Sequence, residues 1–232
     1  MDCKTLDGLT KADGQAFINQ LSPHFSIDPP NFQIVDDGEM NARALEHENI
    51  IEISKELFTK LNRDELIGIL CHELAHFHFG HSKNFKSGIW RLIFNLILLL
   101  PSIPYFYVIW FYPSLLNVIS FVFFCFGWTH LVVHTFPELM YIKFRKNEFQ
   151  ADAKAVEVCG PLCLIKSLIK LHCLRIGSDV TLSSEFEYVA FAASLHDECE
   201  KNKPKGWVFG LTHPPIHKRL YKIFQNCYMV KD

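Results

Sequence analysis

The chain has 232 residues, of which 49% are hydrophobic and 21% are charged, and its formal net charge is −2. This length suffices for one hydrophobic core and is too short for two full-sized domains. The apolar content excludes disorder over most of the chain. Because 23 basic residues face 25 acidic ones, no strongly basic surface of the kind that binds nucleic acid is expected.

The cysteine pattern and the N-terminal composition limit the classes further. None of the eight cysteines forms a Cys-x-x-Cys pair, which argues against a zinc ribbon. The first 25 residues lack the apolar run of a signal peptide. We therefore expect reduced thiols, on the cytosolic side of any membrane involved.

The N-terminal third predicts a mixture of helices and strands. Apolar periodicity and turn residues indicate helices at 10–22, 55–61 and 64–80 and strands at 32–35 and 49–54. The third helix has Asn62 or Arg63 near its start and Gly80 at its end, which are common residues at helix termini.

A long uncharged run follows. The 46 residues from Leu92 to Pro137 contain no Asp, Glu, Lys or Arg. Segments 92–112 and 115–133 are each long enough to cross about 30 Å as a helix. Basic residues flank both outer ends, so we predict a two-helix transmembrane hairpin with both flanks in the cytosol. A buried helical pair in a soluble domain remains the alternative.

Helices are predicted again after the uncharged run, at 145–159, 162–176, 184–201 and 216–225. The expected class is α+β: a mostly helical domain with a small β-sheet, interrupted by the hairpin. The expected segments are 1–88, 89–137 for the hairpin, and 138–232, so the two halves of one domain lie on either side of it.

The most informative stretch is His72-Glu73-Leu74-Ala75-His76, within the predicted helix 64–80. Histidines at i and i+4 lie on one helical face, so both imidazoles can reach one zinc ion. Glu73 is rotated toward the same site without being a ligand, where it can take a proton from a zinc-bound water. This pattern predicts a catalytic zinc site.

Such a site needs a third protein ligand and an open position. A third histidine at position 82 is excluded, because that residue is Ser82. Glu148 and Asp152 lie one helical turn apart, so Glu148 can bind the metal while Asp152 orients a ligand histidine. The alternatives Glu138, Glu157 and Glu185 are weaker, because none has an acidic partner at the same spacing.

These motifs together resemble a known family. An HExxH helix, an apolar hairpin and Glu-x-x-x-Asp, in this order, are similar to the integral-membrane gluzincin metallopeptidases of the HtpX and CAAX prenyl endopeptidase type. Asn41-Ala42 resembles the family's strand beside the cleft, and residues 212–219 resemble its C-terminal Thr-His-Pro-Pro-x-x-x-Arg element. The chain departs from the family in two ways: no apolar helix pair precedes HExxH, and Arg43 stands in place of the common Phe. The resemblance therefore does not indicate the substrate.

The resemblance implies a zincin-like peptidase domain with one zinc ion per chain. It implies that His72, His76 and Glu148 bind the metal, that Glu73 is catalytic, and that His213 stabilises the oxyanion. Arg219 would pair with an acid such as Asp152 and hold the last helix in place.

The expected function is a zinc-dependent membrane-bound endopeptidase that acts on membrane-proximal or misfolded proteins, with its peptidase domain on the cytosolic side. Its expected partners are a protein or peptide substrate and the lipid bilayer, and no nucleic acid. The alternatives are a catalytically silent, zinc-stabilised membrane scaffold and a small transporter. The transporter is disfavoured because HExxH lies outside the apolar run.

Overall fold

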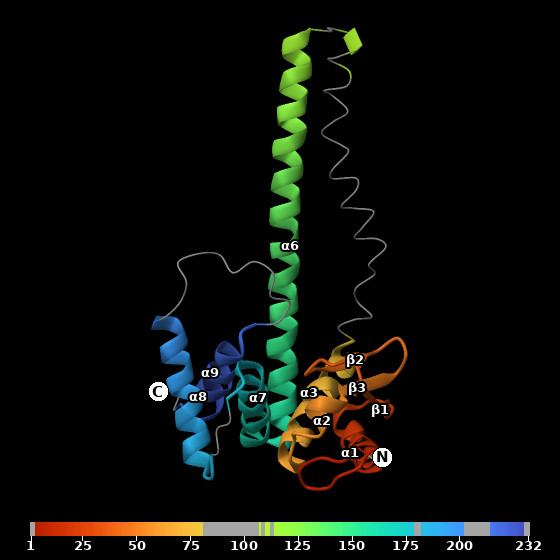
Figure 1. The fold of residues 1–232 in the computed structure, drawn as a ribbon, viewed down its shortest axis with the longest axis vertical. Helices are drawn as coiled ribbons and strands as arrows, with labels where there is room; N and C mark the ends of the chain where they lie inside the picture. Colours follow the sequence, from red (N-terminus) through yellow and green to blue (C-terminus); the bar gives the residue numbers. More distant parts are fainter. Residues whose placement is uncertain are drawn as a thin grey trace. The chain divides into compact units, whose positions relative to one another are not determined.

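A computed structural model describes residues 3–80, 107, 110–111, 114–178, 182–201 and 214–229 (Figure 1). Its described part is mostly helical with one three-stranded sheet, which confirms the α+β class. The chain divides into two compact units, one made of residues 1–83 and 145–232 and the other of residues 84–144. The boundaries expected at residues 88 and 137 remain a prediction.

The N-terminal part of the first unit contains the sheet. Its elements are α1 (Lys11–Leu21), the 3-10 helix η1 (Ser22–Phe25), β1 (Asn31–Val35), β2 (Ala42–Leu45), β3 (Ile50–Ser54), α2 (Lys55–Phe58) and α3 (Arg63–Phe79). The strand order is β1-β3-β2, with β1 parallel and β2 antiparallel to β3. Since β3 is central, β2 is an edge strand that packs against α3.

The C-terminal part supplies four helices: α6 (Leu115–Cys159), α7 (Pro161–Ile176), α8 (Glu185–Lys201) and α9 (Ile216–Cys227). Helix α7 packs against α3, and α7, α8 and α9 pack against one another. The core of the first unit joins the two parts of the sequence, with buried side chains from the sheet, α3 and α7: Ile51, Ile53, Leu66, Leu70, Leu74, Leu164, Ile165 and Leu168.

Helix α3 has well-defined ends. The Asn62 side chain accepts from the backbone N–H of Glu65 at 2.9 Å, and the Glu65 carboxylate accepts from the backbone N–H of Asn62 at 2.8 Å. This capping box fixes the first turn. At the other end Gly80 adopts φ 61°, a left-handed conformation that glycine tolerates without strain. Residues 65–66 and 68–75 between these ends are buried, so the helix is held on nearly all sides.

Helix α6 differs from the prediction. The sequence predicted separate helices at 115–133 and 145–159, whereas one continuous helix of 45 residues runs from Leu115 to Cys159. The predicted break rested on the return of charged residues, and charge alone does not end a helix. The last 15 residues of α6 belong to the first unit, and its earlier residues belong to the second.

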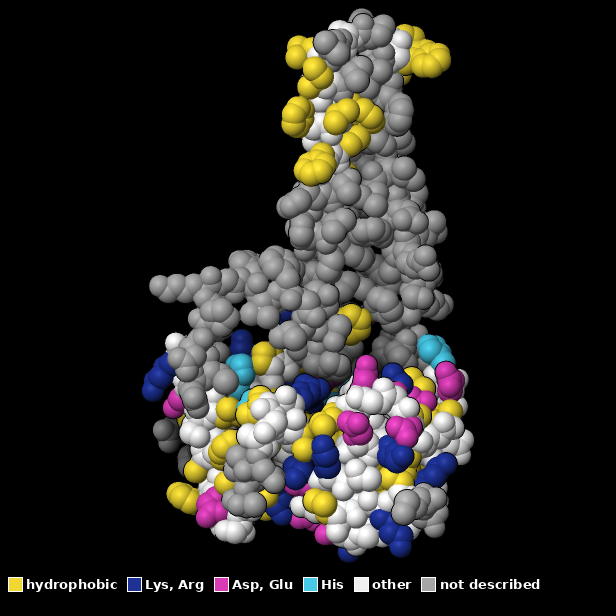
Figure 2. All heavy atoms as spheres, in the orientation of Figure 1, with side chains coloured by type: hydrophobic (Ala, Val, Ile, Leu, Met, Phe, Trp, Pro, Cys, Tyr) yellow, Lys and Arg dark blue, Asp and Glu magenta, His cyan; other side chains and the backbone are white. Residues whose placement is uncertain are grey.

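The start of α6, in the second unit, carries exposed hydrophobic side chains (Figure 2). The exposed large ones on the helix are Leu116, Ile119, Val122, Phe123 and Phe126, and Tyr107, Trp110 and Phe111 precede it in the sequence. Among the helices that the described residues form, none combines the length and apolar character that a membrane crossing requires. Most of the first predicted hairpin segment, 92–112, lies outside the described residues.

Helices α3 and α7 approach each other closely at Gly68. A Cβ atom at this position would collide with the Ser167 hydroxyl and would lie 2.7 Å from the Cys163 carbonyl oxygen. Because that oxygen belongs to the backbone, Gly68→Ala should lower the free energy of unfolding by about 1–3 kcal/mol, the usual cost of overpacking. Gly127→Ala is the control, since its Cβ would meet no atom within 4 Å. Chemical unfolding curves test the pair, and equal midpoints would contradict the packing.

Candidate metal centre

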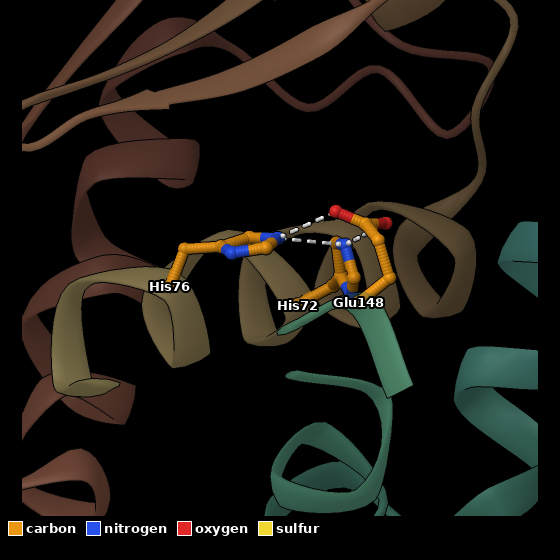
Figure 3. Close-up of side chains that lie close together, drawn as sticks. All are labelled: His72, His76 and Glu148. Atoms are coloured by element: carbon orange, nitrogen blue, oxygen red, sulfur yellow. Dashed lines mark hydrogen bonds and ion pairs between the residues drawn. The ribbon is translucent and has the colours of Figure 1, made fainter. Parts of the chain in front are cut away.

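Helix α3 presents His72 and His76 on one face, one turn apart (Figure 3). Their Nε2 atoms are 3.2 Å apart, and their rings meet edge to face. The exposed fraction of His72 is 8%, so its ring is shielded from solvent. The HExxH spacing therefore brings two imidazole nitrogens to one point, as predicted.

The third side chain comes from α6, 72 residues beyond His76 in the sequence. Glu148 Oε1 lies 3.3 Å from His76 Nε2, and Glu148 Oε2 lies 3.5 Å from His72 Nε2. Two ligands about 2.1 Å from a tetrahedral zinc lie about 3.4 Å apart, so these separations fit a zinc coordination sphere. Of the described residues, only these three form a group that could hold a metal ion, and their chemistry of two imidazoles and a carboxylate suits zinc.

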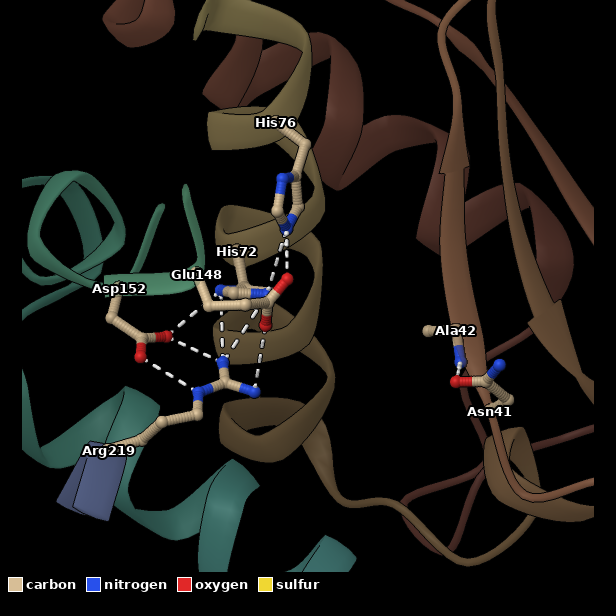
Figure 4. Close-up of polar contacts among 7 residues, drawn as sticks. All are labelled: Asn41, Ala42, His72, His76, Glu148, Asp152 and Arg219. Carbon is tan, nitrogen blue, oxygen red and sulfur yellow. Dashed lines mark hydrogen bonds and ion pairs between the residues drawn. The ribbon is translucent and has the colours of Figure 1, made fainter. Parts of the chain in front are cut away.

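Behind the three side chains lies a buried ion pair between α6 and α9 (Figure 4). Arg219 donates to Asp152 through Nε at 2.8 Å and through Nη2 at 2.6 Å, a bidentate arrangement. Asp152 Oδ1 also lies 3.0 Å from His72 Nδ1. This contact suits an Nδ1–H that donates to the carboxylate, which leaves the Nε2 lone pair of His72 directed at the metal position.

The protonation of His72 is set by opposing effects. Burial and the positive charge of Arg219 lower its pKa, but contacts with the Asp152 and Glu148 carboxylates outweigh them and raise the pKa to about 9 in the absence of metal. For Asp152, burial raises the pKa, yet Arg219 and His72 lower it below its usual value. A metal ion must therefore displace a proton from His72, so metal affinity should fall as the pH decreases below about 9.

The structure sorts the remaining candidates. Glu73, on α3 beside His72, is 7% exposed. Its negative charge is near enough to Arg219 to stabilise the positive charge of the guanidinium. Glu157 is exposed and pairs with Lys154 at 2.8 Å, and Glu185 accepts from the Tyr228 hydroxyl, so neither joins the centre. His213 and the side chain of Glu138 lie outside the described residues.

The predicted pairing of Arg219 with Asp152 is present, but the sequence did not predict that Arg219 also contacts Glu148 and His72. Arg219 Nη1 also lies 3.3 Å from Glu148 Oε2, and Nη2 lies 3.2 Å from His72 Nδ1. One guanidinium thus contacts both the carboxylate and one imidazole of the centre. No local signal shows this, because Arg219 follows His72 by 147 residues.

Comparison with known proteins gives consistent matches. The profile of peptidase family M48 matches residues 10–226. A protein named protease HtpX homolog from Bacteroides fragilis (strain YCH46) is 30% identical over 209 residues, which cover 82% of this chain and 61% of that protein. A protein of the same name from Listeria monocytogenes serotype 4b (strain CLIP80459) is 26% identical over 225 residues, covering 85% and 68%. The chain thus spans about three fifths of the Bacteroides relative.

Removal of any of the three converging side chains should strongly reduce the zinc content of the purified protein, because a catalytic zinc site has only three protein ligands. The variants are His72→Ala, His76→Ala and Glu148→Ala, measured by inductively coupled plasma mass spectrometry. Glu157→Ala, on the same helix as Glu148 but exposed, is the matched control and should retain zinc. Full zinc occupancy in Glu148→Ala would contradict the assignment of the third ligand.

Proposed function

Since this chain belongs to peptidase family M48, we propose that it is a zinc-dependent endopeptidase in which His72, His76 and Glu148 hold the metal. The observation that carries this proposal is the convergence of two imidazoles and a carboxylate at separations of 3.2–3.5 Å. The buried Asp152–Arg219 pair supports it, because a hydrogen-bonded carboxylate behind a ligand histidine is a common feature of zinc sites.

Zinc at this centre would polarise a peptide carbonyl and lower the pKa of a water molecule. The chain's own contribution to the proton transfers is Glu73. Its carboxylate, next to His72 on α3 and shielded from bulk solvent, accepts the proton of the attacking water. The same carboxylate then gives a proton to the leaving amine, so that Glu73 ends each cycle as it began.

The substrate would bind as an extended strand along β2. This strand is at the edge of the sheet and packs against α3, which carries both histidines. An extended peptide that pairs with an edge strand gains main-chain hydrogen bonds irrespective of its sequence. This mode of binding suits an enzyme that acts on many unfolded segments, including misfolded proteins.

His213 remains the proposed donor to the developing oxyanion. It stands three residues before α9 in the sequence, and Arg219 of α9 reaches the centre directly. A hydrogen-bond donor only a few residues before Arg219 in the sequence is therefore well placed to act at the metal centre. A single donor of this kind contributes about 100- to 1,000-fold to the rate of acyl transfer.

The membrane hairpin also remains part of the proposal. The uncharged run from Leu92 to Pro137 and the exposed apolar side chains around the start of α6 both support it. Exposed apolar surface of this extent is unusual on a protein surrounded only by water. With basic residues at both outer ends, the hairpin would keep the peptidase unit on the cytosolic side and favour membrane-proximal substrates.

Glu73→Gln separates catalysis from a scaffolding role. The substitution keeps the shape of the side chain and removes its ability to accept a proton, so proteolysis should fall by about 100- to 10,000-fold while zinc content stays normal. Cleavage of an unfolded protein such as casein, followed by gel electrophoresis, measures the loss. Glu157→Gln, which changes an exposed glutamate, is the control.

Two results would count against this mechanism. Wild-type activity in Glu73→Gln would exclude Glu73 as the proton acceptor. If the wild-type protein bound zinc but cleaved no protein, and Glu73→Gln still complemented a deletion strain, a zinc-stabilised scaffold would replace the peptidase.

The membrane proposal predicts the fractionation and topology of the whole chain. The protein should stay in the membrane pellet after a carbonate wash, and tags at both termini should be protected from a protease added outside sealed cells. A carbonate-soluble protein would exclude the hairpin. Sites near residues 60 and 150 on opposite sides of the membrane would exclude the predicted topology.

A further inference from the structure

Strand β2 has one charged residue, Arg43, whose position is defined by the sheet. Ala42 and Ala44 pair with Ile53 and Ile51, which are buried, so these alanines share the inner face of the sheet. Arg43 pairs with Glu52 and therefore lies on the outer face, where its side chain is 48% exposed. A residue of an added strand that lies beside Arg43 would share this outer face.

The open edge of β2 is set by the hydrogen-bond alternation. Asn41 accepts from the backbone N–H of Ser54, so the backbone of Asn41, and by alternation that of Arg43, is directed at β3. The backbone groups of Ala42 and Ala44 then face the open edge. The Ala42 N–H donates to the Asn41 side chain at 3.0 Å (Figure 4).

The guanidinium of Arg43 is held in place by two acids. Its Nε donates to Glu52 at 2.7 Å, and its Nη2 lies 3.5 Å from Asp37. A guanidinium has five N–H donors in a fixed fork, so these contacts leave it able to donate to a further carboxylate. Because Arg43 is half exposed, a side chain of the paired substrate can reach it.

The surrounding acids weaken this attraction, because the carboxylates of Glu52 and Asp37 contact the same guanidinium. The attraction that remains comes from the N–H donors of the fork that these two acids leave open. Asp36 is paired with Lys55 at 2.8 Å. Directly opposed charges on neighbouring strands interact most strongly, and Arg43 would be the direct neighbour.

We propose that Arg43 is a specificity-determining residue, which selects substrates carrying Asp or Glu at the one position of the bound strand that lies beside it. This inference rests on the proposed function and on substrate pairing with β2. It gives the enzyme a preference for acidic segments within an otherwise sequence-tolerant mode of binding.

The test is a cleavage profile. The full-length, zinc-loaded protein is incubated with a proteome-derived peptide library, and mass spectrometry counts residues at each position around the cleaved bonds. Wild type should favour Asp and Glu over Lys and Arg by about 2- to 5-fold at one fixed position, the range expected for a cross-strand charge pair. Arg43→Gln should abolish this preference, and Arg43→Glu should reverse it.

Two controls make the outcome decisive. Arg175→Glu changes the net charge equally at an exposed site on α7 and should keep the wild-type profile. Zinc content shows whether each variant is folded at its metal centre. Cleavage with the same profile in wild type, Arg43→Gln and Arg43→Glu would overturn the role of Arg43 alone. Zinc-loaded wild type that cleaves no peptide would overturn the proposed function, and this inference with it.

Discussion

The structure of the candidate centre depends on the neutralisation of two buried negative charges, those of the Glu148 and Asp152 carboxylates. Glu148 and Asp152 lie one turn apart on α6, and their exposed fractions are 4% and 2%. Two negative charges that lie this close together and are shielded from water repel each other strongly unless cations neutralise them. Arg219 meets that need, with two hydrogen bonds to Asp152 and an ion pair of 3.3 Å with Glu148. The removal of one partner from such a buried pair costs about 3–5 kcal/mol, so α9 is held to α6 by the same contact that orders the site.

This compensation also decides the state of His72. The ring contacts both members of the Asp152–Arg219 pair, with its Nδ1 atom 3.0 Å from the carboxylate and 3.2 Å from the guanidinium. Asp152 fixes which ring nitrogen carries the proton, while the charge of Arg219 opposes full protonation. Zinc would add two positive charges to that of Arg219, which favours the neutral ring. The metal, the carboxylates and Arg219 thus balance one another's charge. The loss of any one of them would change the protonation of the remaining groups.

Local sequence patterns predicted most of this arrangement, and long-range contacts account for the rest. The caps at Asn62 and Gly80 gave the limits of α3, and the HExxH spacing gave a shared face for His72 and His76. The Glu148–Asp152 spacing gave the third side chain. The continuity of α6 was missed because charge was taken as a boundary. The contacts of Arg219 with His72 and Glu148 join α9 to α3 and α6, and no periodicity within one helix encodes them.

The central claim is that His72, His76 and Glu148 hold zinc, with Asp152 and Arg219 behind them. X-ray absorption spectroscopy at the zinc edge of the purified, full-length protein tests it most directly. The account predicts nitrogen and oxygen neighbours at about 2.0–2.2 Å, with scattering from two imidazole rings. His76→Ala, in whatever fraction retains zinc, should show one imidazole fewer. A sulfur neighbour at about 2.3 Å would indicate a cysteine ligand and would contradict the account.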